Sequence, residues 1–275
     1  MASTGALTKE DLFDLSGKVA LITGGGSGLG LMMAQSLAAN GAKVYICGRT
    51  KDKIETASQV HSKGAVGDII PIQADVSSKE EIRALFDEIG SREKCLCILV
   101  NNAGVCEATY PVAEAKSADE LKRFLFDSDK GTFDSWIDVY RTNVASVYFT
   151  TAAMLPLLQA STEQHPGWSG TVINVGSVSG VVQSAENHFS YNASKAAIRV
   201  NNIAPGVFPS EMTTGESDDV NKSHISKESF EGKVPAARPG KDEDMASTVL
   251  FLAANQYLNG QTVVVDGGNS LATGM

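Results

Sequence analysis

The chain lacks the sequence features that mark proteins of nucleic-acid or membrane surfaces. It has no basic run, and 23 lysines and arginines stand against 32 acidic residues, for a formal charge of −9 and a pI near 5.0. That balance argues against a surface for nucleic acid or anionic lipid. No apolar stretch approaches the roughly 20 residues of a membrane-spanning helix. We therefore expect neither a nucleic-acid nor a membrane partner.

A secretory signal is also missing from the start of the chain. The first 14 positions contain four charged residues, Lys9, Glu10, Asp11 and Asp14. A secretory signal would need an uninterrupted apolar core there. The expected location is therefore the cytoplasm.

Metal-ligand patterns are absent as well. There are only four cysteines, none in a C-x-x-C spacing, and three of them fall in apolar runs that predict strands. They are Cys47, Cys95, Cys97 and Cys106. The four histidines form no i, i+4 pair and lie at His61, His165, His188 and His224. We interpret the cysteines as buried free thiols and expect no metal site.

The composition is that of an ordinary globular protein. Hydrophobic residues make up 43% of the chain and charged residues 20%, which excludes wholesale disorder. No internal repeat of fixed period and no Pro- or Ser-rich linker divides the sequence. A single domain over residues 1–275 is the prediction.

Short apolar runs alternate with longer segments of helical period, a pattern typical of βαβ units and a parallel sheet. Strands are predicted at 18–23, 43–47, 69–73, 95–100, 170–175, 200–203 and 262–265. Helices are predicted at 31–39, 50–63, 78–89 and 136–158. Because the strands are apolar throughout rather than alternating, both faces of the sheet should be covered by helices. The expected fold class is α/β, with a doubly wound parallel sheet in three α/β/α layers.

A glycine-rich loop follows the first predicted strand and opens the first helix. It reads T-G-x-x-x-G-x-G over Thr23 to Gly30, and its candidate cofactor contacts are Gly24, Ser27, Gly28, Leu29 and Gly30. Glycines allow a tight turn and close backbone approach, and free N–H groups at the helix start attract pyrophosphate. Leu31 stands where a nucleotide-hydrolysing loop would have lysine. A plain glycine-rich turn is the alternative, which the flanking strand and helix disfavour.

The end of the second strand bears on which dinucleotide binds. A carboxylate there would bind the ribose hydroxyls and repel a 2′-phosphate, whereas this chain has Gly48-Arg49-Thr50-Lys51. Arg49 can give a phosphate charge-assisted hydrogen bonds, so NADP(H) is favoured as cofactor. The alternative for Arg49 is an ordinary solvated arginine.

A phenol and an ammonium group stand one helical turn apart in Tyr191-Asn-Ala-Ser-Lys195. A cation beside a phenol stabilises the phenolate, which lowers the phenol pKa and makes the group a usable acid near neutral pH. This chemistry suits carbonyl reduction. Taken alone, the pair is more often two surface side chains that share one helix face.

With these motifs the sequence resembles the short-chain dehydrogenase/reductase family. In family order it carries the glycine loop, Asn101-Asn-Ala-Gly104, Asn143, Ser177 and Y-x-x-x-K, and Pro205-Gly206 and Asp266-Gly267-Gly268 extend the similarity. The resemblance implies a Rossmann fold with about seven strands. It also implies a homodimer or homotetramer.

The resemblance also implies roles for the site residues. Tyr191 would be the general acid or base at the substrate oxygen, and Ser177 would hydrogen-bond that oxygen, with Ser179 as a competitor for the serine role. Lys195 would hold the ribose hydroxyls and lower the Tyr191 pKa, and Asn143 would secure a water that links Lys195 to solvent. Outside the resemblance, a turn hydroxyl and a helix amide are the simpler interpretations of Ser177 and Asn143.

Further cofactor contacts follow from the same resemblance. Asp75 and Asn102 match the family's adenine-side and ribose contacts, and Ser210 replaces the usual threonine while keeping a hydroxyl. The finer match is to β-ketoacyl reductases of the rhamnolipid type and to microbial ketoreductases. The implied activity is hydride transfer between NADP(H) and a ketone or secondary alcohol, such as a 3-oxoacyl thioester or a small ketone. A polyol or sugar dehydrogenase of the same family is the alternative.

One departure from the family is severe. Only Ala196, Ala197 and Ile198 separate Lys195 from Arg199, where the next apolar run starts. A parallel crossover needs about a dozen residues, so the return strand should be out of reach, and about 15 to 25 residues are lacking. Either the natural protein carries this segment and the present sequence omits it, or the gene encodes the shorter form. The shorter form supports a second hypothesis, a catalytically impaired dinucleotide-binding protein.

The segment from Cys106 to Ser135 is longer than its counterpart in many relatives. Its position after the Asn-Asn-Ala-Gly motif suggests that it borders the substrate pocket. A solvated insertion is an equally good interpretation.

Overall fold

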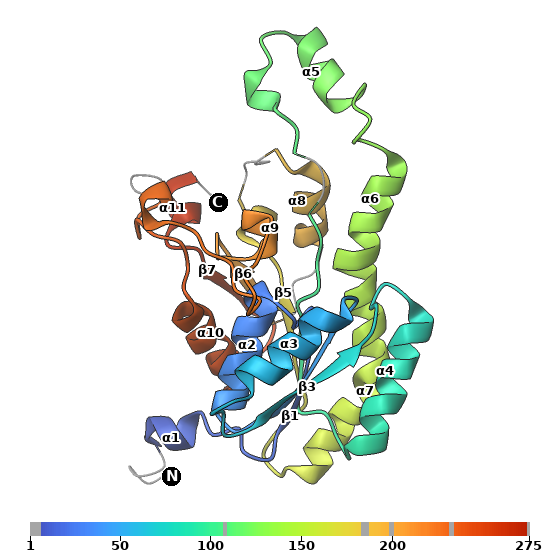
Figure 1. Cartoon of the computed structure of the whole chain (residues 1–275), viewed down its shortest axis with the longest axis vertical. Helices are drawn as coiled ribbons and strands as arrows, with labels where there is room; N and C mark the ends of the chain where they lie inside the picture. The colour runs from blue at the N-terminus through green and yellow to red at the C-terminus, as the bar shows by residue number, and fades with distance from the viewer. Residues whose placement is uncertain (1–6, 107–108, 183–186, 198–200, 231–233, 274–275) are drawn as a thin grey trace.

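Seven parallel strands form one sheet in the order β3-β2-β1-β4-β5-β6-β7 (Figure 1). The computed structural model describes residues 7–106, 109–182, 187–197, 201–230 and 234–273. The strands are β1 (Val19–Thr23), β2 (Lys43–Gly48), β3 (Asp68–Gln73), β4 (Ile98–Asn101), β5 (Thr171–Val175), β6 (Asn202–Pro205) and β7 (Thr262–Val265). The strand order reverses between β1 and β4, so a crevice opens at their carboxyl ends, where doubly wound proteins bind ligands. The predicted fold class is confirmed.

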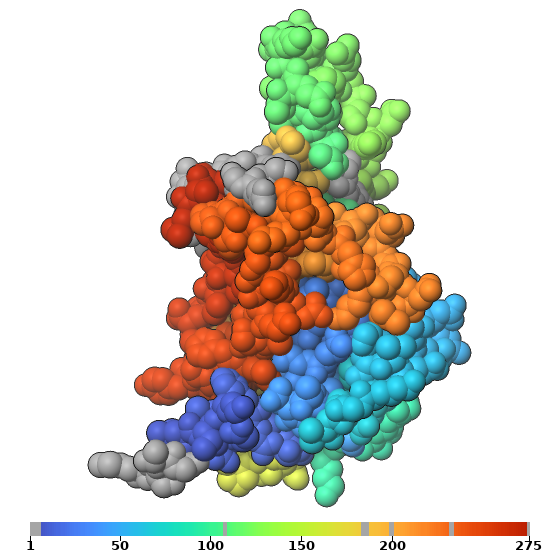
Figure 2. All heavy atoms as spheres, turned by 60° about the vertical axis from the view of Figure 1, so that its left-hand side comes forward, coloured from blue at the N-terminus to red at the C-terminus, as the bar shows by residue number. Residues whose placement is uncertain are grey.

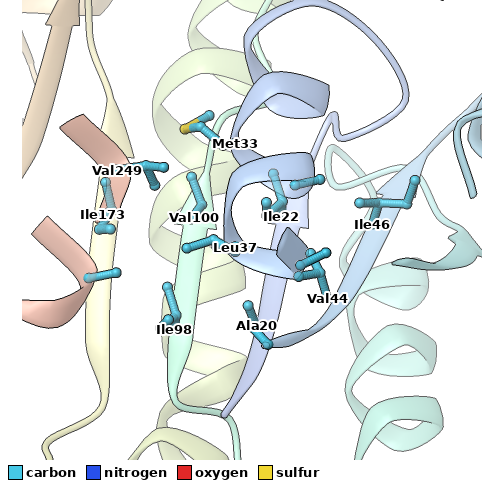
Figure 3. Packing of buried hydrophobic residues seen from close by; sticks show 14 of the residues in the cluster. Ala20, Ile22, Met33, Leu37, Val44, Ile46, Ile98, Val100, Ile173 and Val249 are labelled. Atoms are coloured by element: carbon cyan, nitrogen blue, oxygen red, sulfur yellow. The ribbon is translucent and has the colours of Figure 1, made fainter. Parts of the chain in front are cut away.

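Helices cover both faces of this sheet. One face is covered by α2 (Gly28–Ala39), α3 (Lys51–His61) and α10 (Asp242–Ala254). The other face is covered by α4 (Lys79–Arg92) and α7 (Ser146–Gln164). Figure 3 shows Met33 and Leu37 of α2 on the side chains of β1, β2 and β4. The continuous apolar strands are thus explained by burial on both sides.

A single helical run connects the sheet to the long segment that precedes it, Cys106 to Ser135, called the insertion below. It comprises α6 (Phe133–Tyr140), the π-helical turn η3 (Arg141–Ala145) and α7, and it is longer than the predicted helix at both ends. By length and composition the run Phe133–Gln164 could span a membrane, so the expectation that no stretch reaches that length was wrong. Its α7 part packs on α4, β4 and β5, which is the position of a helix that covers a sheet.

The short crossover does reach the return strand, and the contrary prediction was wrong. Helix α8 (Phe189–Ala196) is followed by β6, whose first residue lies beside Asn174, near the carboxyl end of β5. The chain therefore has to return only part of the way down the sheet. It enters β6 through Asn201, which has a φ of +32°, a conformation that asparagine tolerates better than most residues. Ile198 to Val200 lie outside the described residues.

This short connection leaves part of the sheet uncovered. On β7, Val263 and Val265 pack on the core shared with α2 and α10, while Thr262 and Val264 on the opposite face are exposed. A crossover helix of ordinary length would cover that face. The side-chain oxygens of Asn201 and Asn202 nearby are buried and find no hydrogen-bond partner among the described residues.

The insertion stands away from the sheet. It contains the turn η2 (Val112–Glu114) and α5 (Ala118–Leu125), in which no residue is buried, and it projects beyond α8 (Figures 1 and 2). At its base Tyr110 packs edge-on against Phe189, with ring centroids 6.0 Å apart. The α5 part is therefore a solvated projection, and residues 107–108 lie outside the described part of the chain.

Short elements complete the described chain. They are α1 (Lys9–Leu12), η4 (Val178–Gly180), α9 (Glu211–Thr214), η5 (Lys227–Phe230) and α11 (Asn269–Thr273). None of the four cysteines forms a disulfide. Cys47 lies in β2 as predicted, but β4 begins only at Ile98, so Cys95 and Cys97 precede the strand and the prediction that they lie in it was wrong.

Candidate active site

A cavity of about 450 Å³ opens at the carboxyl ends of the strands and is lined in part by α8 and α9. It brings together residues that are far apart in the sequence, from the glycine loop to the Y-x-x-x-K motif. The predicted residues in its wall are Gly24, Ser27, Gly28, Leu29, Asn102, Ser177, Ser179, Tyr191, Lys195 and Ser210. The cofactor and catalytic candidates therefore face one space.

The glycine loop has the backbone of an anion-binding turn. Gly24 and Gly28 have φ angles of +66° and +51°, a region that side chains other than glycine disfavour. A Cβ on Gly30 would lie 2.2 Å from the carbonyl oxygen of Gly24, so this position needs glycine for close approach. Ser27 precedes α2 without capping it through its side chain. The first N–H groups of α2 thus remain available for a pyrophosphate, and the loop fits a dinucleotide.

A smaller recess of about 140 Å³ continues the cavity toward β2 and β3. It shares Gly24 and Gly104 with the cavity and is lined by Arg49 and Asp75. Burial opposes ionisation of Asp75, but hydrogen bonds from Ser77 and the nearby Arg49 charge outweigh it, so the Asp75 pKa is lowered. The recess therefore offers one cation and one carboxylate to the adenosine end of a bound dinucleotide.

Asn102 holds the loop in place. Its side-chain amide donates to the carbonyl oxygens of Thr23 and Gly24 at 2.9 and 3.1 Å, and its backbone N–H donates to Thr23 Oγ1. The neighbouring Asn101 donates instead to Thr151 and Asn174 and ties β4 to α7 and β5. The side-chain amide of Asn102 thus makes its hydrogen bonds within the protein. The residue also lines the cavity, where a ribose contact was predicted.

Tyr191 and Lys195 lie on α8, as their spacing predicts. The Lys195 Nζ is 5.6 Å from the centroid of the Tyr191 ring and donates to the Val175 carbonyl oxygen at 2.8 Å. Lys195 is only 9% exposed. Burial lowers the pKa of its ammonium group to about 8, and the nearby Cys106 opposes this effect only weakly. Lys195 is therefore a buried cation beside the phenol of Tyr191.

Ser177 lies two residues after the end of β5, just before η4, and is buried in the cavity wall. Its Oγ accepts a hydrogen bond from the backbone N–H of Ser179 at 3.1 Å. A hydroxyl that accepts in this way keeps its own proton to donate. Ser177 can therefore donate to an oxygen in the cavity, and Ser179 supports it through its backbone.

Asn143 lies behind the cavity wall, in the π-helical turn η3. Its side chain accepts from the Val105 N–H at 2.8 Å and donates to the Val105 carbonyl and to Ser194 Oγ, both at 2.9 Å. Ser194 in turn donates to the Tyr191 carbonyl. Such π-helical turns are frequent at functional sites. Asn143 thus connects the long helix to α8 and to the segment after Gly104.

Sequence reasoning missed a polar pair on the substrate side. Cys106 Sγ lies 3.5 Å from His188 Nδ1, and both residues line the cavity. Their positions, two residues after Gly104 and three before Tyr191, were the available signal. Val207, Phe208 and Met212 form an apolar part of the same wall. The cavity can therefore receive a partly apolar molecule beside a phenol, a hydroxyl and an ammonium group.

The arrangement can supply a proton to an oxygen atom and stabilise the charge that develops there. Comparison with known proteins also points to an oxidoreductase. The family described as short chain dehydrogenase matches residues 18–221. The short-chain dehydrogenase/reductase PhomF of Diaporthe leptostromiformis is 36% identical over 293 residues, covering 98% of this chain and 97% of PhomF. That alignment is longer than the 275 residues here, so PhomF has residues at positions where this chain has none.

A bacterial relative is similar in both sequence and structure. The rhamnolipids biosynthesis 3-oxoacyl-[acyl-carrier-protein] reductase of Pseudomonas aeruginosa is 35% identical over 280 residues, covering 93% of this chain and 97% of the relative. The Pseudomonas aeruginosa RhlG/NADP active-site complex has a TM-score of 0.75 and 33% identity, covering 94% of this chain and 98% of that one. The chain belongs to the short-chain dehydrogenase/reductase family of oxidoreductases, whose members bind a nicotinamide cofactor.

Proposed function

We propose that this protein is an NADP(H)-dependent reductase that converts a ketone to a secondary alcohol. The observation that carries the proposal is the single cavity shared by the glycine loop, Ser177, Tyr191 and Lys195. Within the family, its relatives include a 3-oxoacyl-[acyl-carrier-protein] reductase and a protein solved as a complex with NADP. We place the activity in the cytoplasm.

The choice of NADP(H) depends on the recess at the end of β2. Arg49 is exposed there, and Asp75, the carboxylate in the lining, accepts two hydrogen bonds from Ser77 at its Oδ1. Arg49 would hold a 2′-phosphate, and the N–H groups at the start of α2 would hold the pyrophosphate.

Reduction of a ketone needs a hydride at its carbon and a proton at its oxygen. The bound cofactor supplies the hydride. Tyr191 would donate its phenolic proton to the oxygen while Ser177 donates a hydrogen bond to the same atom. The Lys195 ammonium, 5.6 Å from the Tyr191 ring, would stabilise the phenolate that remains. In the oxidative direction the same phenolate would take the alcohol proton.

Asn143 would act as a positioning residue in this scheme. It fixes Ser194 and the segment after Gly104, and a Cβ on Gly104 would meet both Asn143 Oδ1 and Lys195 Nζ within 3.4 Å. The amide and the ammonium therefore flank the same glycine. A solvent molecule linking Lys195 to the exterior, as the family resemblance implies, would pass beside this point.

A homodimer or homotetramer is part of the proposal. The side of α6 and α7 that faces away from the sheet exposes large apolar residues, among them Ile137, Tyr148 and Leu155, each at least 50% exposed. Exposed large apolar side chains gathered on one helical run favour an association site there. Light scattering on the purified protein would give the oligomeric state, and a monomer at micromolar concentration would contradict this part of the proposal.

The test of the function is a substrate panel with NADPH, followed by the loss of NADPH absorbance. We expect turnover with a 3-oxoacyl thioester or a small ketone, and a lower kcat/KM with NADH than with NADPH. Preferential oxidation of open-chain polyols or sugar acids would favour the polyol dehydrogenase alternative. Binding of NADPH without turnover of any of these compounds would favour the catalytically impaired alternative.

A further inference from the structure

A second group of reactive side chains lies near the amino end of the central strand β4, whereas the cavity lies at the carboxyl ends of the strands. Cys95 and Cys97 precede β4, and His165 follows the last residue of α7. Their ligand atoms all lie within 4.8 Å of one another, and the two Sγ atoms are 4.0 Å apart. The proposed reductase uses none of the three. The spacing of cysteines along the sequence gave no sign of this cluster because its histidine comes from a distant segment.

The backbone holds the two cysteines firmly. Leu96 donates its N–H to the Leu157 carbonyl of α7 at 2.9 Å, and Cys97 donates to the Val19 carbonyl of β1 at 2.8 Å. The Cys97 carbonyl accepts from the N–H of Thr171 in β5 at 2.9 Å. Because Leu96 points the other way from its neighbours along the extended chain, both thiols fall on one face.

His165 is fixed by a separate pair of hydrogen bonds. Its N–H donates to the Ser161 carbonyl at 3.0 Å, and its carbonyl accepts from the Trp168 N–H at 2.9 Å. The imidazole is half-buried, whereas Cys97 is fully buried and Cys95 is 5% exposed. The cluster is therefore open to solvent on the His165 side.

The donor set and its geometry suit a thiophilic cation. Two thiolates and an imidazole are common ligands of Zn²⁺, and tetrahedral bonds of about 2.3 Å place two sulfur ligands about 3.8 Å apart. The sulfur separation of 4.0 Å is close to that value. All three donor atoms already lie within 4.8 Å of one another, so an ion between them would draw them together by a short distance. Three protein ligands leave the fourth position to solvent.

The charges around the cluster are compatible with this cation. Two thiolates balance the charge of a divalent ion, and a neutral imidazole adds no charge to it.

We propose that Cys95, Cys97 and His165 form a binding site for a zinc-type divalent cation. The ion would join the start of β4 to the end of α7 and so tie the two elements together. The proposal does not depend on the reductase function.

The test uses the full chain, reduced and freed of metal, with Zn²⁺ and Cd²⁺ as probes. Calorimetry should give one Zn²⁺ per chain, and Cd²⁺ should produce thiolate-to-metal charge-transfer absorption. His165→Gln should weaken Zn²⁺ binding at least tenfold, whereas His224→Gln, at an exposed histidine, should leave it unchanged. Saturating Zn²⁺ should raise the melting temperature of the wild type but not of His165→Gln.

Thiol variants separate this site from the other soft ligand pair in the described chain, Cys106 and His188. Cys97→Ser should abolish the Cd²⁺ absorption, and Cys47→Ser, at a buried thiol outside the cluster, should retain it. Circular dichroism confirms that each variant is folded. The proposal is overturned if the wild type binds no stoichiometric Zn²⁺, if Cys97→Ser binds as well as the wild type, or if Cys106→Ser is the variant that loses binding.

Discussion

The buried ammonium group of Lys195 should cost the protein stability that a neutral side chain would restore. Its pKa falls from an ordinary 10.5 to about 8 because the group is buried. Since each tenfold change in proton binding is worth about 1.4 kcal/mol, keeping Lys195 charged below pH 8 costs the folded state about 3 kcal/mol. Lys195→Met keeps the length of the side chain and removes the charge, but it gives up the hydrogen bond to Val175, worth about 1 kcal/mol.

We therefore expect Lys195→Met to raise the free energy of unfolding of the cofactor-free protein by about 2 kcal/mol at pH 7. The sign of the pH dependence follows from the lowered pKa. The unfolded chain binds the proton more tightly than the folded one, so the cost is complete below pH 8. It is relieved as the pH rises toward 10.5, the ordinary value. The advantage of the variant should shrink over that interval.

Urea denaturation of both proteins at pH 7 and near pH 10 measures this difference, and differences between other titrating groups cancel in the comparison. Lys51→Met serves as the matched control, because Lys51 is exposed and its 3.7 Å ion pair with Glu55 should be worth little. Lys195→Met should also lose reductase activity. A variant that is less stable than the wild type at pH 7, or equally favoured at both pH values, would refute the reasoning.

Three further predictions concern the cofactor, the positioning network and the short crossover. Arg49→Ala should raise the KM for NADPH about tenfold, the value of one exposed charge-assisted hydrogen bond, and leave the KM for NADH nearly unchanged. Asn143→Ala leaves the Val105 N–H without its partner and should cost about 1 to 3 kcal/mol in urea denaturation while lowering kcat. Val264→Lys should change stability by less than about 0.5 kcal/mol because the residue is on the uncovered face of β7. As a control, Ile203→Ala, at a fully buried position, should cost about 2 to 5 kcal/mol. If protein with the mass of this chain, 28.9 kDa, loses much stability on Val264→Lys, then this face of β7 is covered.

The sheet was predictable because its strands are buried on both faces. Runs such as Val19–Thr23 and Lys43–Gly48 are apolar and β-branched without alternation, and the glycine loop marks the first strand–helix turn. The Y-x-x-x-K pair was likewise visible from helical spacing, and the structure brings Tyr191 to the same cavity as Ser177. These features depend on local sequence, which is why they could be read in advance.

Other features depend on contacts that the sequence does not display. The reach of the crossover is set by the register of β6 on β5, where the described pairing is limited to Asn174 and Val175. The π-helical turn that carries Asn143 and the meeting of Cys106 with His188 depend on the packing of distant segments. Spacing rules along one chain do not detect such contacts.

The measurement that tests the central claim most directly is the rate of NADPH-dependent ketone reduction by the wild type and by Tyr191→Phe. Phenylalanine keeps the ring that lies beside Lys195 and removes only the phenolic oxygen, so cofactor binding serves as the internal control. We predict that NADPH binds Tyr191→Phe within a few-fold of its wild-type affinity, while kcat falls by about 10²-fold or more, the usual contribution of a general acid. Reduction by Tyr191→Phe at a rate near that of the wild type would contradict the account.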